Sequence, residues 1–209
     1  MGVEEALGGL KKGRMAVLYD SEGREGEADL VFSARFASPE KVEALRKDAG
    51  GLLCAAIGGK DAEEIGLPFF TDVLEGAGNG LQRMSCVRTG YGDRPAFSLP
   101  VNHRDVYTGI TDNDRALTLK RLDEVVRGRK EDFAEEFCSP GHVFLLIGRG
   151  LENRRGHTEL ALELAERAGL GGAVALCEML GKGRALPKKD AIAYARRHNL
   201  AFVEGKELV

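Results

Sequence analysis

The sequence predicts an α+β protein built on one mixed β-sheet with packed helices. Segments with helical periodicity and short apolar segments typical of strands follow one another along all 209 residues. They do not alternate in the strict strand–helix–strand order of a parallel α/β fold. The composition, 43% hydrophobic and 30% charged, is ordinary for a globular protein. Since no repeat, linker or low-complexity segment divides the chain, we expect one domain over residues 1–209.

The helices are predicted from apolar stripes and from residues that favour helix ends. Ser38-Pro39 places an N-cap before a proline at the first helical position, and Gly50-Gly51 follows the last turn. Thr111–Asp114 begins the clearest helix, because acidic side chains favour the positive end of a helix. The predicted helices cover residues 3–10, 39–49, 60–65, 111–126, 158–168 and 188–198.

Short apolar segments between these helices are predicted to be strands. Pro100 interrupts one of them and argues for an edge or a bulge, because proline cannot donate a hydrogen bond to a neighbouring strand. Residues 71–94 have no period, so we expect irregular structure with one strand near 84–87, and Ser139-Pro140-Gly141 is predicted to be a turn. The predicted strands cover residues 15–19, 29–33, 52–57, 97–101, 142–147, 173–179 and 201–203.

Charge and apolar patterning exclude several classes of protein. The net charge of −3 provides no basic surface for nucleic acid or an anionic membrane. No apolar run approaches the roughly 20 residues of a spanning helix, and the N-terminus lacks the features of a secretory signal. We therefore expect a cytoplasmic protein that binds neither nucleic acid nor membrane. The four cysteines form no Cys-x-x-Cys pair, which argues against a zinc site or a disulfide framework.

Three carboxylates follow one another at the start of a predicted strand. In an extended chain alternate side chains share a face, so Glu25, Glu27 and Asp29 would project to one side. Neighbouring carboxylates repel one another, and a cation or a polyhydroxyl ligand among them would explain the pattern, because hard divalent ions prefer carboxylate oxygens. The alternative is a solvated edge strand that uses charge against aggregation.

A second polar segment precedes a predicted helix. A helix start leaves N–H groups unpaired and carries partial positive charge. Gly156 allows a close approach of the backbone, Thr158 adds a hydroxyl, and Arg154 and Arg155 lie just upstream, a combination typical of a phosphate site. The alternative is a capped helix after a solvated basic loop. His157 is a candidate metal ligand or acid–base group, although a lone histidine is more often a hydrogen-bonded structural residue.

Two further side chains are candidates for proton transfer. Glu178 sits inside the apolar run of residues 173–179, where a carboxylate either faces a site or costs desolvation energy unless it has a partner. His142 begins a predicted buried strand and has the same two interpretations as His157. Together these features predict a phosphate subsite beside a carboxylate-rich cation subsite, bridged by a small phosphorylated sugar.

The motifs and their order resemble those of the 3,4-dihydroxy-2-butanone 4-phosphate synthases of riboflavin biosynthesis. The resemblance implies the fold of that family, and a lyase that converts D-ribulose 5-phosphate to 3,4-dihydroxy-2-butanone 4-phosphate and formate with Mg²⁺ or Mn²⁺. The implied chemistry is a metal-stabilised enediolate, dehydration and skeletal rearrangement. A homodimer with sites near the subunit interface is also implied. The matching segments are residues 24–29, 108–115, 140–144, 154–159 and 176–178.

The resemblance also implies roles for individual residues. Glu25 and His157 would hold the metal and contact the substrate there. The hydroxyl groups of the sugar would be bound by Arg24, Asp29 and Glu178. Among catalytic groups the resemblance implies His142 together with Glu178, and Glu27 is a further candidate base.

The phosphate is implied to lie at the start of the helix near residue 158. Arg154, Arg155, Gly156 and Thr158 would cradle it, with Thr108 nearby. Many members of the family have glycine where Arg155 stands, so this position either contacts phosphate through its backbone or points away.

Two other functions are consistent with the same residues. One is a different metal-dependent sugar-phosphate enzyme, such as an isomerase or an aldolase. The other is a non-catalytic module that binds phosphorylated ligands or nucleic acid, and the acidic balance of the chain disfavours nucleic acid.

Overall fold

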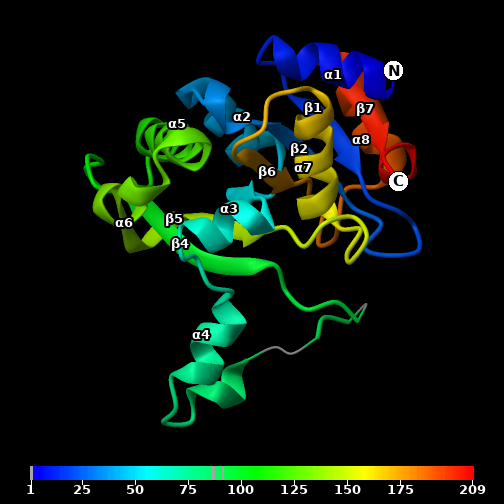
Figure 1. Ribbon diagram of the computed structural model, residues 1–209. Coiled ribbons are helices and arrows are strands. Elements are labelled where there is room, and N and C mark those ends of the chain that lie inside the picture. Colours follow the sequence, from blue (N-terminus) through cyan, green and yellow to red (C-terminus); the bar gives the residue numbers. More distant parts are fainter. Residues whose placement is uncertain (1, 86–87, 91) are drawn as a thin grey trace.

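All seven strands belong to one mixed sheet in a computed structural model that describes residues 2–85, 88–90 and 92–209. The strands are β1 (Ala16–Tyr19), β2 (Ala28–Ser33), β3 (Cys54–Ile57), β4 (Phe97–His103), β5 (Phe137–Ile147), β6 (Val174–Glu178) and β7 (Ala201–Glu204). Their order across the sheet is β4-β5-β3-β6-β2-β1-β7 (Figure 1). The pairs β1–β7 and β3–β5 are parallel and the others are antiparallel. The predicted α+β class with a mixed sheet is confirmed.

Helices cover both faces of the sheet. They are α1 (Val3–Lys11), α2 (Pro39–Asp48), α3 (Gly59–Glu64), α4 (Phe70–Gly76), α5 (Asp112–Gly128), α6 (Phe133–Glu136), α7 (His157–Arg167) and α8 (Lys188–Arg197). Successive strand residues point to opposite faces, so Leu30 joins the core beneath α2, α5 and α8, whereas Val31 joins the core beneath α1 and α7. Among the described residues, no helix has the length and apolar character needed to cross a bilayer.

The N-cap predicted at Ser38 is present, and the helix predicted to begin at Thr111 is capped by that residue. The Ser38 hydroxyl accepts the N–H of Lys41 at the start of α2, and the Thr111 hydroxyl accepts the N–H of Asp114 at the start of α5. Each bond satisfies one of the N–H groups that a helix start leaves without a partner. These two local signals locate the starts of helices α2 and α5, which cover one face of the sheet.

The predicted turn at Ser139-Pro140-Gly141 is wrong, because these residues lie inside the long strand β5. Strand β5 pairs with the edge strand β4, and the register shifts around Pro100 and Val101. A Cβ at Gly141 would lie 1.9 Å from the carbonyl carbon of Val101. Glycine is therefore required by the close approach of β4 and not by a reversal of the chain. The edge position expected from Pro100 is confirmed.

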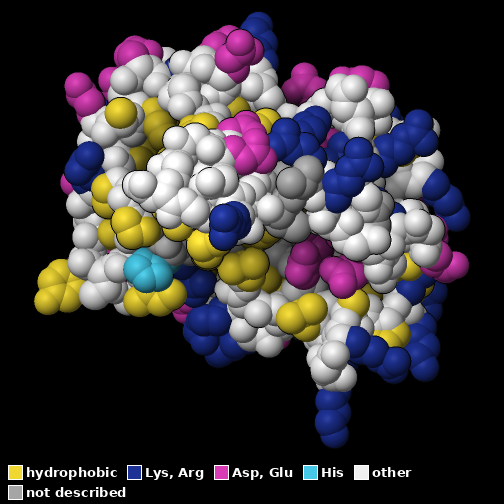
Figure 2. Space-filling model, turned by 90° about the horizontal axis from the view of Figure 1, so that it is seen from below, with side chains coloured by type: hydrophobic (Ala, Val, Ile, Leu, Met, Phe, Trp, Pro, Cys, Tyr) yellow, Lys and Arg dark blue, Asp and Glu magenta, His cyan; other side chains and the backbone are white. Residues whose placement is uncertain are grey.

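The strand predicted near residues 84–87 is also wrong where the structure describes it. Helix α4 is followed by a 3₁₀ turn, Leu81–Met84, and residues 86–87 lie outside the described ranges. Helix α4 lies away from the sheet (Figure 1), and Thr71 is its only buried residue. On the face seen from below in the orientation of Figure 1, the surface mixes apolar and charged side chains (Figure 2). Because α4 buries little surface, its sequence has no apolar stripe of helical period, and the helix could not be predicted from the sequence.

Candidate active site

The acidic segment forms a turn and not the start of a strand. Strand β2 begins at Ala28 and lies between β1 and β6, so neither the predicted alternation of Glu25 and Glu27 along a strand nor the alternative of a solvated edge strand is correct. Buried Asp20 organises the turn, because its carboxylate accepts the N–H groups of Glu25 and Glu27, each at 3.1 Å. Gly26 has a φ of +68°, a conformation that glycine adopts without strain.

Two carboxylates face each other across neighbouring strands. Asp29 of β2 pairs in register with Glu178, the last residue of β6. Asp29 is 1% exposed, whereas Glu178 is exposed at the end of its strand. Of the two interpretations of Glu178, the structure agrees with a carboxylate that faces a site, because its exposed side chain lines a pocket while Cys177 and Met179 on either side are buried. Burial raises the pKa of Asp29 to about 7, although the nearby His157 opposes the rise.

His157, the first residue of α7, lies among these carboxylates. Its Nδ1 is 3.3 Å from Oε2 of Glu25, and its Nε2 is 3.0 Å from the carbonyl oxygen of Glu27 and 3.6 Å from Oδ1 of Asp29. Burial lowers the pKa of His157, but the carboxylates of Asp29 and Glu25 outweigh it and raise the value to about 9. Burial and the nearby Glu178 and Glu25 also raise the pKa of Glu27.

Two groups of side chains in the described ranges offer ligand atoms within 4.8 Å of one another. One consists of Asp20, Glu25 and His157, and the other of Glu25, Glu27 and Glu178. Glu25 belongs to both. Asp20 already accepts hydrogen bonds from two backbone N–H groups and from the Arg24 guanidinium. Its role is therefore to hold the turn, and it is a poorer candidate for a metal ligand. Carboxylate oxygens with one imidazole fit Mg²⁺ or Mn²⁺.

The loop before α7 is organised around the buried carboxylate of Glu159. This carboxylate accepts hydrogen bonds from Nη1 of Arg154 at 2.6 Å, from the backbone N–H of Arg149 at 3.1 Å and from the backbone N–H of Gly156 at 3.3 Å. A Cβ at Gly156 would lie 2.4 Å from Nη1 of Arg154 and 2.7 Å from Nη2 of Arg24. The two guanidinium groups therefore rest against Gly156 at the start of the helix.

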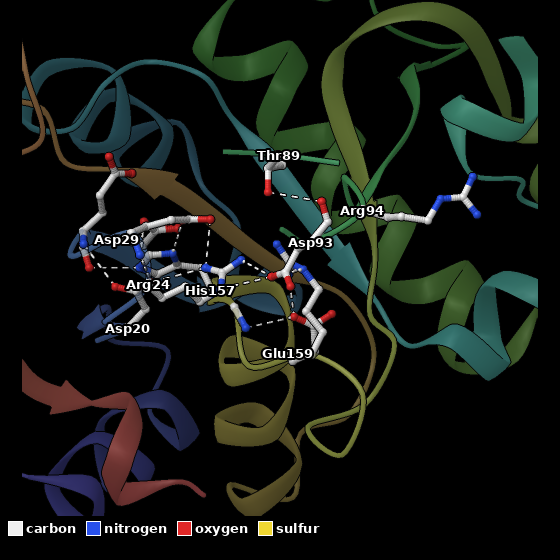
Figure 3. A network of polar contacts seen from close by, with 12 residues as sticks. Asp20, Arg24, Asp29, Thr89, Asp93, Arg94, His157 and Glu159 are labelled. Atoms are coloured by element: carbon white, nitrogen blue, oxygen red, sulfur yellow. Dashed lines mark hydrogen bonds and ion pairs between the residues drawn. The ribbon is translucent and has the colours of Figure 1, made fainter. Parts of the chain in front are cut away.

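Asp93 joins the acidic turn to this loop. Its Oδ2 accepts hydrogen bonds from Nη2 of Arg24 at 2.9 Å and from Nε of Arg24 at 3.2 Å. The same oxygen lies 3.4 Å from Nε of Arg154. Figure 3 shows the carboxylate of Asp93 reaching toward Arg24, while the side chain of Arg94 points away. Arg94 instead pairs with Asp72 and with Glu75 on α4.

A pocket of about 220 Å³ brings the polar groups together. Its lining includes the carboxylate–imidazole group and the start of α7, together with apolar residues of β3, β4, β5 and β6 and of the segments just before β3 and β4. The polar lining residues are Glu25, Asp29, Thr89, Arg154, His157, Thr158 and Glu178.

Six predicted site residues do not line this pocket. Arg24, Glu27 and Gly156 lie against residues that do, whereas Thr108, His142 and Arg155 lie apart from it. The exposed Thr108 donates its hydroxyl and its N–H to Asp114, both at 3.3 Å. His142 of β5 donates its N–H to Oδ1 of Asn102 on β4 at 2.9 Å. Arg155 is exposed and lines a neighbouring hollow with Arg24 and Arg154. Within one chain, none of the three reaches the groups around His157.

Sequence reasoning missed three residues that organise the site. Asp20 lies outside the segments for which the sequence predicts a site, Asp93 falls in the segment without a period, and Glu159 belongs to a matching segment but has no predicted role. Glu159 stands three residues after Gly156, at the position where an acidic side chain favours a helix start, which is a usable local signal. Asp93 has no such signal, because its partner Arg24 is 69 positions away.

Comparison with known proteins identifies the family of the chain. Residues 4–209 match the family described as 3,4-dihydroxy-2-butanone 4-phosphate synthase. A synthase of that name from Archaeoglobus fulgidus is 45% identical, over 99% of this chain and 92% of the relative. Another from Methanothermobacter thermautotrophicus is 41% identical, over 99% and 94%.

Solved structures share the fold. The synthase structure from Candida albicans superposes with a TM-score of 0.79 at 28% identity, covering 100% of this chain and 95% of that one. A further synthase structure, described as a complex with two magnesium ions, has a TM-score of 0.80 at 24% identity over the same shares of the two chains. The chain belongs to the 3,4-dihydroxy-2-butanone 4-phosphate synthase family, a family of lyases.

Proposed function

We propose that this chain converts D-ribulose 5-phosphate to 3,4-dihydroxy-2-butanone 4-phosphate and formate, a step of riboflavin biosynthesis. The observation that carries the proposal is the meeting of Glu25, His157 and Arg154 in one pocket. A phosphorylated sugar needs a cationic end for its phosphate and a carboxylate-rich end for its hydroxyl groups or a bound ion. The names of the family and of the relatives support the same reaction.

Glu25 and His157 are the residues that would hold Mg²⁺ or Mn²⁺. Their donor atoms lie 3.3 Å apart, and the mixture of oxygen and nitrogen donors suits these ions. The magnesium complex described for one structural relative agrees with this choice. When bound, the ion supplies Lewis-acid chemistry at the carbonyl of the substrate. The roles proposed for Asp29 and Glu178 are to bind and orient the sugar's hydroxyl groups beside it. Arg24 contacts Glu25 and also Asp93, which it shares with Arg154, so we propose that its guanidinium lies between these hydroxyl groups and the phosphate.

The phosphate is proposed to lie at the start of α7. Arg154 supplies a guanidinium and Thr158 a hydroxyl, and the start of the helix favours an anion because it leaves N–H groups unpaired and carries partial positive charge. Gly156 keeps this approach open, because any side chain there would enter the space of Arg154 and Arg24. Fixing the phosphate at this end holds the sugar's reactive carbons beside the carboxylates.

Glu27 and Glu178 are the carboxylates best placed to move protons within one chain. Each offers an oxygen within 4.8 Å of Glu25, and the pKa of Glu27 is raised, which favours a group that accepts and returns a proton. His142 is a third candidate, but it lies outside the pocket of its own chain.

We propose that the protein acts in the cytoplasm as a homodimer. The second copy of the chain would account for the position of His142. We assign Thr108 and His142 to the pocket of a second copy of the chain. Beside Thr108, the side chains of Tyr107 and Ile110 are 97% and 52% exposed, as expected of residues that a partner covers. Mixing a His142→Ala chain with a Glu25→Gln chain tests this: restored activity supports shared sites, and a mixture as inactive as either variant contradicts them.

Incubation with ribulose 5-phosphate and magnesium tests the reaction itself. Release of formate, lost in the Glu25→Gln variant, supports the synthase. A pentose phosphate isomer as sole product would instead identify an isomerase that uses the same subsites.

A further inference from the structure

We propose that Asp93 is an internal anion that occupies the arginine pair, Arg24 and Arg154, in the free protein and is exchanged for the phosphate of the substrate. The inference deepens the proposed function and rests on it in one respect, namely that the anion received by the pair is a phosphate. It assigns Asp93 a role in selecting phosphorylated ligands.

The contacts of Asp93 are those that arginine makes with phosphate. One carboxylate oxygen accepts two N–H groups of Arg24, at 2.9 and 3.2 Å, and lies 3.4 Å from Nε of Arg154. Two N–H groups of one guanidinium directed at one anionic group are the donor arrangement that arginine offers to carboxylates and phosphates alike. A phosphate and the Asp93 carboxylate cannot use the same N–H groups at the same time.

The two arginines are held in place without Asp93. Nη1 of Arg24 contacts Oδ2 of Asp20 at 3.3 Å and Oε1 of Glu25 at 2.8 Å. Nη1 of Arg154 is bound to the buried Glu159 at 2.6 Å. The arginine side chains are only 12% and 8% exposed, whereas that of Asp93 is 32% exposed. Of the groups around the pair, Asp93 is therefore the carboxylate best placed to leave.

The chain beside Asp93 is anchored independently of the arginine pair. Arg149 donates to the carbonyl oxygens of Arg94 and Pro95 at 3.3 and 3.2 Å, and its guanidinium lies 4.0 Å from the centre of the Phe69 ring. The side chain of Arg94 points away from the pair (Figure 3). Exchange at Asp93 therefore requires the release of one side chain and leaves the anchor at Arg149 intact.

Thr89 connects this exchange to the pocket. Its N–H and its hydroxyl bind the carbonyl oxygen of Asp93, at 2.7 and 3.1 Å, and Thr89 lines the pocket. A sugar without phosphate gains nothing from displacing Asp93, whereas a phosphorylated sugar gains the contacts of both arginines. The wild-type affinity for phosphate is then the intrinsic affinity of the arginine pair multiplied by the fraction of molecules in which Asp93 has released the pair.

The test measures binding of inorganic phosphate to the full chain by titration calorimetry at constant ionic strength. The D93N variant is expected to bind phosphate about three- to tenfold more tightly than wild type, because the competing carboxylate is gone. A D93S variant should change the affinity in the same direction. D72N is the matched control, because it removes a carboxylate that pairs with Arg94 and not with the arginine pair. This variant should bind phosphate within about twofold of wild type.

Equal or weaker phosphate binding by both Asp93 variants would overturn the inference, and so would the absence of measurable binding to wild type and variants alike. Thermal unfolding of each variant distinguishes a lost fold from a lost site. The readout involves no turnover, so its outcome is separate from that of the formate assay. Tighter binding without formate release would reject the proposed reaction alone, and formate release without tighter binding would reject only the exchange at Asp93.

Discussion

Glu25 and His157 are 132 positions apart in the chain, yet Oε2 of the first lies 3.3 Å from Nδ1 of the second. The glutamate belongs to the turn before β2, a strand near the middle of the sheet, and the histidine begins α7, which covers one face of that sheet. The pair therefore forms only when the sheet and this helix are both in place. The proposed cation subsite is therefore a property of the folded chain.

Removal of the Glu25 carboxylate should abolish turnover and preserve the fold. We expect the Glu25→Gln variant to lose at least about 100-fold in kcat/KM, because a lost metal ligand removes several kcal/mol of transition-state stabilisation. The melting temperature should change by no more than about 3 °C. Steady-state formate assays and thermal unfolding measure both effects.

Glu22→Gln is the matched control, since this side chain of the same turn is 81% exposed. Its activity should stay within about twofold of wild type, as for most exposed sites. Full activity in Glu25→Gln, or an equal loss in Glu22→Gln, would contradict the assignment of the metal to Glu25.

Magnesium binding should release a proton and strengthen with rising pH. The pKa of His157 is about 9, so this imidazole is mostly protonated at pH 7.5, whereas an ordinary histidine is mostly neutral there. A metal binds only the neutral form, so the apparent affinity should increase by about tenfold per pH unit below pH 9. Calorimetry in buffers of different ionisation enthalpy counts the protons. Affinity that is constant from pH 6.5 to 8.5 would remove His157 from the ligand set.

A methyl group at Gly156 should weaken substrate binding without unfolding the protein. The φ of −94° at this residue is accessible to alanine, so the backbone tolerates the change. The added Cβ would displace the guanidinium groups of Arg154 and Arg24, and we expect KM to rise about tenfold, a loss of about 1.4 kcal/mol. Gly23→Ala is the control, because a Cβ there meets no atom within 4 Å. Equal KM values in the two variants would disprove the steric account.

Arg154 and Arg155 should differ in their effect on KM. Lysine at position 154 keeps the charge but loses the guanidinium, which binds Glu159 and is proposed to bind the phosphate. We expect Arg154→Lys to raise KM about tenfold with a smaller effect on kcat, and Arg155→Lys to stay near wild type because that side chain is exposed. An unchanged KM in Arg154→Lys would argue against the phosphate assignment.

Much of the fold could be predicted because the decisive signals are local. Ser38 and Thr111 cap the helices where the sequence places them, and the apolar runs at β3 and β6 are buried strands. Errors occur where a distant partner decides the conformation. Pro140-Gly141 is typical of a turn, but the approach of β4 holds these residues in a strand.

The site was predictable to the same extent and for the same reason. Sequence motifs indicated Glu25, His157 and Arg154, and the structure brings these side chains into one pocket. Nothing local distinguishes Asp93 from other acidic loop residues, because its role arises from Arg24 and Arg154 on two other segments. The exposure of Glu178 could not be predicted either, since it depends on where β6 ends at the edge of the pocket.

An NMR time course with uniformly carbon-13-labelled ribulose 5-phosphate and magnesium tests the central claim most directly, because it follows the substrate, the rearranged skeleton and the one-carbon product together. We predict that labelled formate and a four-carbon phosphate appear at equal rates with the wild-type chain and are absent with Glu25→Gln. Conversion to another pentose phosphate without formate would contradict the claim.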